Sequence, residues 1–361
     1  MGLMDRIKQF WQNRKLKQLP EGQFENYYQY YEDNNNNNWL LQSGNYGQAT
    51  KLDNDIERFL DCYYDRLQQC DLTQPLDNYR KAYTALVGMN GEQVTEEEYY
   101  NNKFKENELL NQIVNDNKYT FQINDQFYHI KSQGYEMPNY QDMVRIYVNC
   151  SNGKIEELSQ AILDYNNNPN FYMKIPSNDS NAQNPRGEKV VIYCRKNEID
   201  YTIDLLKYSK QQRPDLFQNS EKTLPFIENV DNIASIAYQP ITDMYIGLNN
   251  QTKKIPQSVN SFITSMLEES YMESAREIAR ADINLNFLLN NDKYYDETAY
   301  MLNYPYIKNN YKDYLIGSMK AKMEVLSRKN NIYIDGINYE QQYQKENNTQ
   351  SQNRGEDYES R

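Results

Sequence analysis

The stretch FYMKIPSNDSNAQNPRGEKVVIYC, residues 171–194, joins two strings of apolar, β-prone residues through a polar segment rich in turn-forming residues. This pattern predicts two neighbouring strands of a sheet. The first string contains Lys174, and Arg186 precedes the second string. Because a buried charge is unfavourable without a partner, these two cations are expected either to face water or to bind an oppositely charged group.

Three candidate strands, 143–150, 170–175 and 188–194, alternate between apolar and polar side chains. Successive side chains of a strand point to opposite faces, so the apolar positions are expected to pack in a core. The remaining positions predict one shared polar face, which consists of Arg145, Tyr147, Asn149, Tyr172, Lys174 and Tyr193.

A face made of tyrosines and cations suits an anionic group on a peptide, most simply a phosphate. The alternative interpretation is a sheet whose second face is solvated, with its lysine and arginine residues keeping the sheet edges soluble. The residues alone leave both interpretations open.

The order of the expected elements predicts an α+β protein with two domains. Residues 1–118 have helical spacing and are expected to form a helical N-terminal domain, in which residues 20–53 are a low-complexity loop. Residues 119–338 are expected to form a mixed or antiparallel sheet covered by helices. Residues 339–361 have almost no large aliphatic side chain and predict a disordered tail.

Three local signals support this division. Thr95 followed by Glu98 has the spacing of a capping box and marks a helix start. Two short strings around residues 119–132 predict a hairpin. Helical spacing returns after residue 258, and these helices are expected to cover one face of the sheet.

Composition excludes several classes of protein. The chain of 361 residues has 51 acidic and 39 basic residues, a net charge of −12, which argues against nucleic acid as a partner. Its 35 tyrosines supply the apolar area that a folded core needs.

The four cysteines form no CxxC pair, so neither a metal site nor a disulfide framework is expected. The P-loop, dinucleotide and zinc-hydrolase strings are absent from the sequence, and no cofactor is expected.

Cysteine usage and the lack of a long apolar stretch predict a cytoplasmic protein. Residues 4–19 form a basic amphipathic helix candidate that could touch an anionic membrane surface, although packing on its own domain is the simpler interpretation. The single histidine, His129, lies in an alternating strand string. We interpret it as a structural or surface residue rather than as part of a catalytic relay.

The strings RIYVN, FYMKI, PRGEKVVIYC and RPDLFQNSEKTLPF, with helices between them, resemble the HopA-type effector family of plant-pathogenic bacteria over about residues 140–265. Some homologues of that family occur beside peptide-modifying kinases. The resemblance implies an α+β effector, delivery into a host cell by a specialised secretion system, and a kinase or a secretion chaperone as partner.

The same order of strings is more distantly similar to the phosphothreonine lyases, which remove phosphate from a phosphorylated threonine by β-elimination without metal or organic cofactor. By this resemblance Lys174 is the base that withdraws the Cα proton, Arg186 holds the phosphate, and Tyr193 assists. Tyr147 occupies the position of the general-acid histidine of the lyases, so the chain departs from their pattern there.

The chain departs from the lyases at a second place, because the string IAYQPITDMYIGL has none of their further phosphate-binding arginines. Arg145 or Lys222 is the cation expected to compensate. Two functions follow: a lyase-like protein that acts on a phosphorylated serine or threonine of a peptide or protein, and a catalytically inactive effector or interaction module that docks a host or partner protein.

Overall fold

The computed structural model describes residues 49–71, 77–124, 126–139, 142–218, 224–238, 241–246, 251–256, 258–291, 297–329 and 334. The helix expected over residues 4–19, most of the loop expected over residues 20–53 and the expected tail 339–361 lie outside the described residues.

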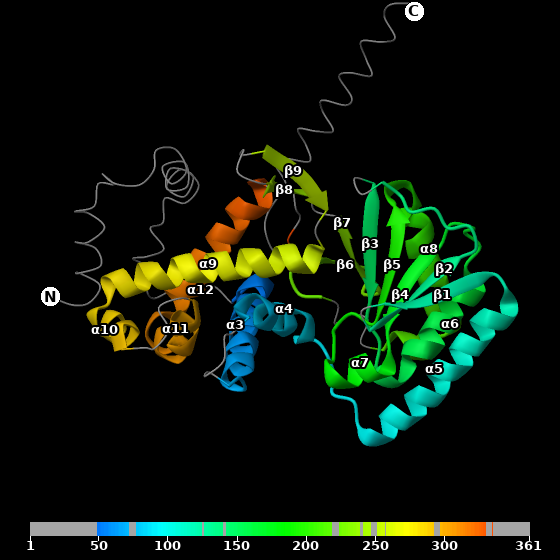
Figure 1. Ribbon diagram of the computed structural model, residues 1–361, viewed down its shortest axis with the longest axis horizontal. Helices are drawn as coiled ribbons and strands as arrows, with labels where there is room; N and C mark the ends of the chain where they lie inside the picture. The colour runs from blue at the N-terminus through cyan, green and yellow to red at the C-terminus, as the bar shows by residue number, and fades with distance from the viewer. Residues whose placement is uncertain are drawn as a thin grey trace, which may run out of the picture.

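The described residues form an α+β fold with an antiparallel sheet, as the sequence predicts (Figure 1). Seven strands follow the order β1-β2-β4-β5-β3-β7-β6, and each neighbouring pair is antiparallel. The strands are β1 (Tyr119–Asn124), β2 (Phe127–Ser132), β3 (Met143–Val148), β4 (Tyr172–Pro176), β5 (Val190–Arg195), β6 (Glu228–Val230) and β7 (Ala234–Tyr238). A separate antiparallel pair consists of β8 (Ile241–Ile246) and β9 (Gln251–Pro256).

The helices precede, interrupt and follow the sheet in the chain. They are α3 (Lys51–Gln68), α4 (Asn78–Gly88), α5 (Glu96–Asp116), α6 (Ile155–Tyr165), α7 (Asn178–Gln183), α8 (Ile199–Gln212), α9 (Val259–Ala281), α10 (Ile283–Asn291), α11 (Glu297–Leu302) and α12 (Tyr304–Lys329), with short 3₁₀ turns η2 (Asn152–Lys154), η3 (Lys196–Glu198) and η4 (Pro214–Phe217).

Side-chain caps define the starts of two long helices. The capping box predicted at Thr95 and Glu98 is confirmed at the start of α5. A second capping box, made by Thr50 and Asp53, starts α3 at Lys51, so the helix begins inside the segment that was expected to be a loop. The reciprocal bonds satisfy backbone N–H groups that the first helical turn leaves without partners.

Helices α5, α6 and α8 cover one face of the sheet, on the right in Figure 1. Their apolar side chains form a buried cluster with those of Val144, Ile146 and Val148 on β3. Met173 on β4 and Ile192 on β5 belong to the same cluster. The alternation predicted from the sequence therefore selects the correct core face on all three strands.

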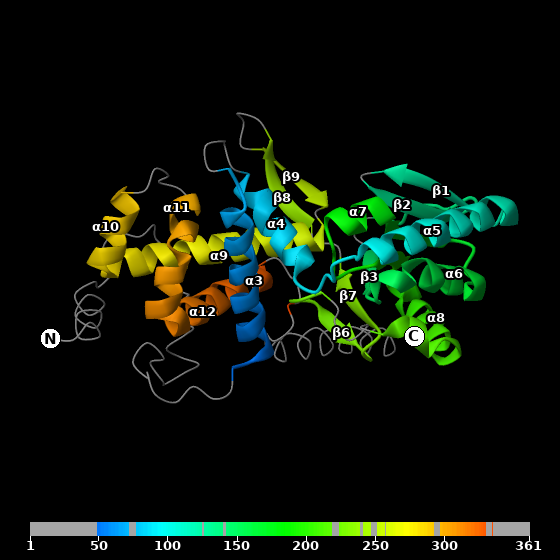
Figure 2. The same cartoon turned by 90° about the horizontal axis from the view of Figure 1, so that it is seen from below.

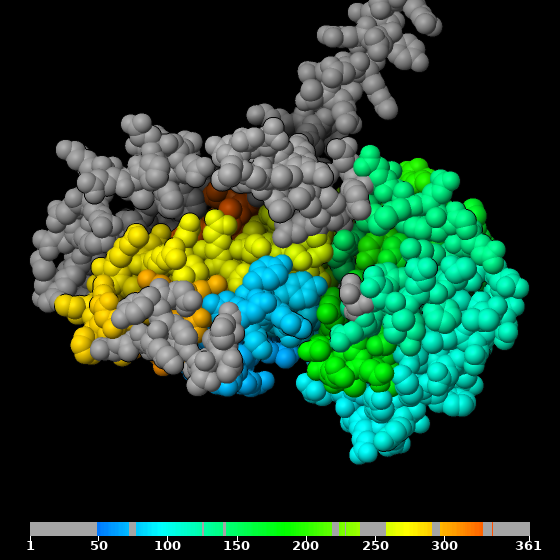
Figure 3. Space-filling view, viewed as in Figure 1, coloured from blue at the N-terminus to red at the C-terminus, as the bar shows by residue number. Residues whose placement is uncertain are grey.

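The helices from the two ends of the chain pack on one another. Helices α3 and α4 contact α9, α11 and α12, whereas α5, which the sequence groups with the N-terminal helices, packs on β1, α6 and α7. Figures 2 and 3 show α3 and α4, in blue, beside α9, in yellow. Their core is continuous with the second face of the sheet, because Tyr147, Tyr172 and Tyr193 belong to the same buried cluster as these helices.

The polar segment between the two strings of the opening stretch contains the short helix α7, which the sequence analysis treats as a loop. The Ser177 side chain caps α7 by accepting a hydrogen bond from the backbone of Ser180. Asn181 of α7 donates a hydrogen bond to the Asn152 side chain at 3.2 Å, and Asn102 of α5 donates to the Asn152 carbonyl at 3.1 Å. Tertiary hydrogen bonds thus stabilise a helix whose residues favour turns.

The search for membrane-spanning helices, confined to the described residues, found none of sufficient length and apolar character. The four cysteines are free thiols, and Cys150 and Cys194 are buried.

Replacing Ile146 by alanine should destabilise the fold by about 3 kcal/mol, because it removes a fully buried side chain and leaves a cavity between β3 and the helices. Ile123→Ala on β1 is the matched control, because Ile123 is 63 % exposed; its loss should be under about 0.5 kcal/mol. Urea unfolding followed by circular dichroism measures both changes. Equal losses in the two variants would contradict the assignment of the core face.

Candidate functional site

The register of the sheet brings the polar side chains of neighbouring strands into two rows on one face. The first row consists of Lys131, Tyr172, Tyr193, Arg145 and Ala237. The second row consists of His129, Lys174, Val191, Tyr147 and Ser235. The prediction that the polar positions of three strands share a face is therefore confirmed. We call these residues, together with Phe127 and Arg186, the tyrosine-cation face.

In the first row, two adjacent aromatic rings lie between two cations. The rings of Tyr172 and Tyr193 stack with their centroids 4.3 Å apart and their planes 10° apart. The Arg145 guanidinium lies 5.4 Å from the Tyr193 ring centroid, and Lys131 Nζ lies 5.0 Å from that of Tyr172. Cation–π attraction offsets part of the cost of holding these charges against a largely buried surface.

Lys174 and Arg186 each lie against the Phe127 ring of β2. Lys174 Nζ lies 4.3 Å from the ring centroid, and the Arg186 guanidinium carbon lies 4.9 Å from it. Lys174 comes from β4, whereas Arg186 comes from the segment between α7 and β5. The two cations of the opening stretch thus contact the same ring, although helix α7 separates them in the chain.

Close contact with α4 holds the Arg186 segment in place. The backbone N–H of Gly187 donates to the Val87 carbonyl at 2.9 Å. A Cβ built on Gly91 would lie 2.5 Å from the Pro185 carbonyl oxygen, so only glycine allows this approach. The end of α4 therefore fixes the position from which Arg186 reaches over the sheet.

Glu188 is a partner of Arg186 that the sequence analysis did not identify. The Arg186 guanidinium lies 3.3 Å from Glu188 Oε1, which also accepts a hydrogen bond from Asn260 of α9 at 3.3 Å. Burial opposes the charge on Arg186, but the Glu188 carboxylate and the Tyr83 side chain together outweigh this effect and raise the pKa of the guanidinium. The spacing of the two residues in the string RGE is the signal in the sequence that could have revealed the pair.

Several buried donors on the tyrosine-cation face make no hydrogen bond to another described residue. They are the Nε atoms of Arg145 and Arg186, Oη of Tyr147 and Oγ of Ser235. Tyr147 and Ser235 lie opposite each other in the register of β3 and β7. Burial raises the pKa of the Tyr147 phenol, which therefore keeps its proton and remains a donor. Buried donors of this kind normally have a partner, so the set favours an anionic ligand.

The single histidine is joined to this face rather than to a catalytic relay. His129 Nδ1 lies 2.5 Å from Tyr172 Oη, and the two rings are stacked with their centroids 5.9 Å apart. Burial raises the pKa of Tyr172. These contacts give His129 the structural position that the sequence predicts for it.

Lys189 is a second residue that the sequence analysis passed over. Its residue exposure is 1 %, and its Nζ donates a hydrogen bond to Asn181 Oδ1 of α7 at 2.8 Å. Burial lowers the pKa of Lys189 to about 8. An amine of this kind can act as a base near neutral pH, but its burial keeps it from a peptide substrate, and its bond to Asn181 indicates a structural role.

The comparisons with known proteins give one kind of match. No family model matches the chain, and no curated protein matches it. The structure is similar to that of an effector protein from Pseudomonas syringae pv. tomato strain DC3000, with 10% identity and a TM-score of 0.37, over 70% of this chain and 99% of that chain. An effector protein from Pseudomonas syringae pv. syringae strain 61 is similar at 9% identity and a TM-score of 0.36, over 63% of this chain and 94% of that chain.

Both of these structures are effector proteins from Pseudomonas syringae. Their descriptions name neither the HopA family nor a lyase. At these identities and TM-scores, the likeness carries no conclusion about activity.

Arg186→Gln should destabilise the fold by about 3 kcal/mol, because it leaves the Glu188 carboxylate, which is 5 % exposed, without its cation. In the double variant with Glu188→Gln, the loss should be smaller than the sum of the two single losses. Urea unfolding of the wild type, the two single variants and the double variant gives the coupling free energy between Arg186 and Glu188. Additive losses would show that the pair is not formed. The exposed pair Lys207 and Asp231 is the control, and its removal should cost much less.

Proposed function

We propose that the tyrosine-cation face binds the phosphate of a phosphorylated serine or threonine in a peptide or protein. The observation that carries this proposal is the set of unpartnered donors on Arg145, Tyr147, Arg186 and Ser235. Phosphate offers the acceptor oxygens that such donors need, and guanidinium groups bind it in a bidentate manner.

The arrangement of the neighbouring side chains supports a peptide as the carrier of the phosphate. The stacked rings of Tyr172 and Tyr193 offer a flat aromatic surface beside the cations. Tyrosine is enriched at protein interfaces because one end of its ring is apolar and the other forms hydrogen bonds. These rings are only 6 % and 7 % exposed, so a peptide that carries the phosphate would reach them only if the helices packed on this face moved.

In its catalytic form, the proposal is a β-elimination like that of the phosphothreonine lyases. The Lys174 amine takes the Cα proton, the electron pair of the C–H bond forms the Cα=Cβ double bond, and the Cβ–O bond breaks so that phosphate leaves with the electron pair of the Cβ–O bond. Tyr147 has a protonated phenol that can donate a proton to the leaving phosphate. Lys174 acts as a base only when its amine is neutral.

A non-catalytic interaction module is the second candidate function. One observation favours it: the Glu188 carboxylate already pairs with the Arg186 guanidinium at 3.3 Å, so a phosphate would have to compete with it. In that case the face docks a partner protein, for example a host protein, a kinase or a secretion chaperone, and leaves it unmodified. The two candidates share the recognition step and differ in the role of Lys174.

Binding of a fluorescent phosphothreonine peptide tests the recognition step. The wild-type chain should bind the phosphorylated peptide and not its unphosphorylated counterpart, and Arg145→Gln should weaken binding by about tenfold or more, because it removes a charge-assisted hydrogen bond. Lys207→Met on α8, whose helix covers the opposite face, is the control and should bind like the wild type. Equal binding of both peptides would refute the proposal.

Mass spectrometry of the same peptide tests the catalytic step. A lyase removes the elements of phosphoric acid and leaves a dehydroamino acid, whereas a phosphatase leaves the hydroxyl amino acid. Lys174→Met should retain binding and lose turnover, since it keeps the length of the side chain and removes the amine. A wild-type chain that binds the phosphopeptide and never changes its mass is a binding module.

A further inference from the structure

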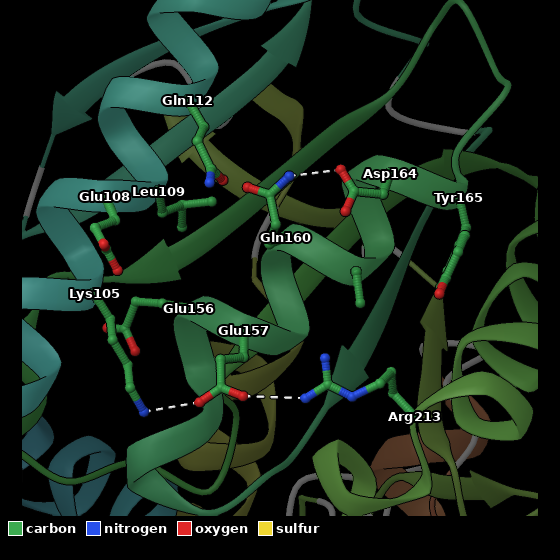
Figure 4. Close-up of a pocket in the computed structure, with 11 residues that line it drawn as sticks. Lys105, Glu108, Leu109, Gln112, Glu156, Glu157, Gln160, Asp164, Tyr165 and Arg213 are labelled. Carbon is green, nitrogen blue, oxygen red and sulfur yellow. Dashed lines mark hydrogen bonds and ion pairs between the residues drawn. The ribbon is translucent and has the colours of Figure 1, made fainter.

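The groove between α5 and α6 lies on the helix-covered side of the sheet, away from the tyrosine-cation face (Figure 4). It has a volume of about 240 Å³ and is lined mainly by polar side chains of these two helices, together with Arg213. This volume is below that of a typical drug-sized site and suits a ligand of a few heavy atoms.

Both cations that line this groove already pair with a carboxylate. Lys105 Nζ lies 2.8 Å from Glu157 Oε1, and an Arg213 guanidinium nitrogen lies 3.1 Å from Glu157 Oε2. Figure 4 shows the Glu157 carboxylate between the two cations. Lys105 also donates a hydrogen bond to the Gly153 carbonyl at 2.8 Å, so this end of the groove is not a site for an anion.

Two acceptors in the groove have no hydrogen-bond partner among the described residues. Glu156 is 5 % exposed, and its Oε2 atom is buried and unpartnered. The Oε1 atom of Gln160, one helical turn further along α6, is also buried and unpartnered. The Gln160 amide nitrogen donates to Asp164 at 2.6 Å, whereas its carbonyl oxygen has no partner. Buried acceptors of this kind normally accept a bond from some donor.

The missing partner is therefore a donor, and the carboxyl groups favour one with positive charge. Glu108 adds an exposed carboxylate to the lining. Within the described ranges no group of histidine, cysteine, aspartate and glutamate side chains could hold a metal ion, so an organic cation fits better than a metal. We propose that the α5–α6 groove binds a small organic ammonium compound whose N–H groups donate to Glu156 and Gln160.

The electrostatic surroundings of Glu156 give this binding a pH dependence. Burial raises the pKa of Glu156 to about 7. Its own backbone N–H and Lys105 of α5 oppose this shift, whereas Glu106 of α5 and Glu157 of α6 reinforce it, and the buried Cys150 thiol lies nearby. An ammonium group binds the ionised carboxylate, so binding releases a proton and strengthens as the pH rises through about 7.

Isothermal titration calorimetry of the full chain with putrescine tests the proposal, with butanediol as a neutral ligand of the same length. Putrescine should bind roughly tenfold more tightly at about pH 8 than at about pH 6, since the ionised fraction of a carboxyl with this pKa changes by that factor. Butanediol should give no binding at either pH. Glu156→Gln should weaken putrescine binding by about tenfold or more and abolish its dependence on pH.

Two further variants make the outcome independent of folding defects. Gln160→Met removes the second acceptor from a partly exposed position and should also weaken binding. Glu97→Gln removes an exposed carboxylate of α5 outside the groove and should bind like the wild type. The proposal is overturned if putrescine gives no heat with the wild type, if butanediol binds equally well, or if the Glu156 and Gln160 variants both bind like the wild type. A lysine-containing peptide that binds where putrescine does not would also overturn it and point to a protein partner.

Discussion

The antiparallel register of β4, β5 and β3 is the constraint on which both faces of the sheet depend. It places Tyr172 opposite Tyr193 and Tyr193 opposite Arg145, so the polar side chains of all three strands fall on the same side. Since side chains alternate along a strand, a shift by one residue would exchange the two faces. The apolar side chains under α5, α6 and α8 oppose such a shift, because it would bring cations into the core.

The tyrosine-cation face is held against a helical bundle made from both ends of the chain. The Arg186 segment contacts α4 through Gly187 and the narrow approach at Gly91, and Glu188 contacts α9 through Asn260. The same cation that faces the sheet therefore also takes part in joining the sheet to the helices. An anion that displaced Glu188 from Arg186 would change this junction, which links recognition at the face to the packing of the helices.

The two sides of the sheet carry unpartnered buried groups of opposite character. On the tyrosine-cation face the atoms without partners are mainly donors, whereas in the α5–α6 groove they are the acceptors of Glu156 and Gln160. Buried polar atoms without partners are costly to a fold. Their separation by type suggests two different ligands, an anion on one side and a cation on the other.

The sequence by itself determined the α+β class, a mixed or antiparallel sheet, the core face of β3, β4 and β5 and the capping box at Thr95, because all of these follow from local periodicity and from bonds between near neighbours. Only the tertiary structure decided that α3 and α4 pack with α9 and α12. The spacing of apolar residues in a helix shows which side is buried, but it does not show which helix packs against that side. The pairing of Arg186 with Glu188, the contact of Arg186 and Lys174 with the same Phe127 ring and the helix α7 depend likewise on distant segments brought together by folding. Burial, which sets the pKa values of Glu156 and Lys189, exists only once those segments have packed.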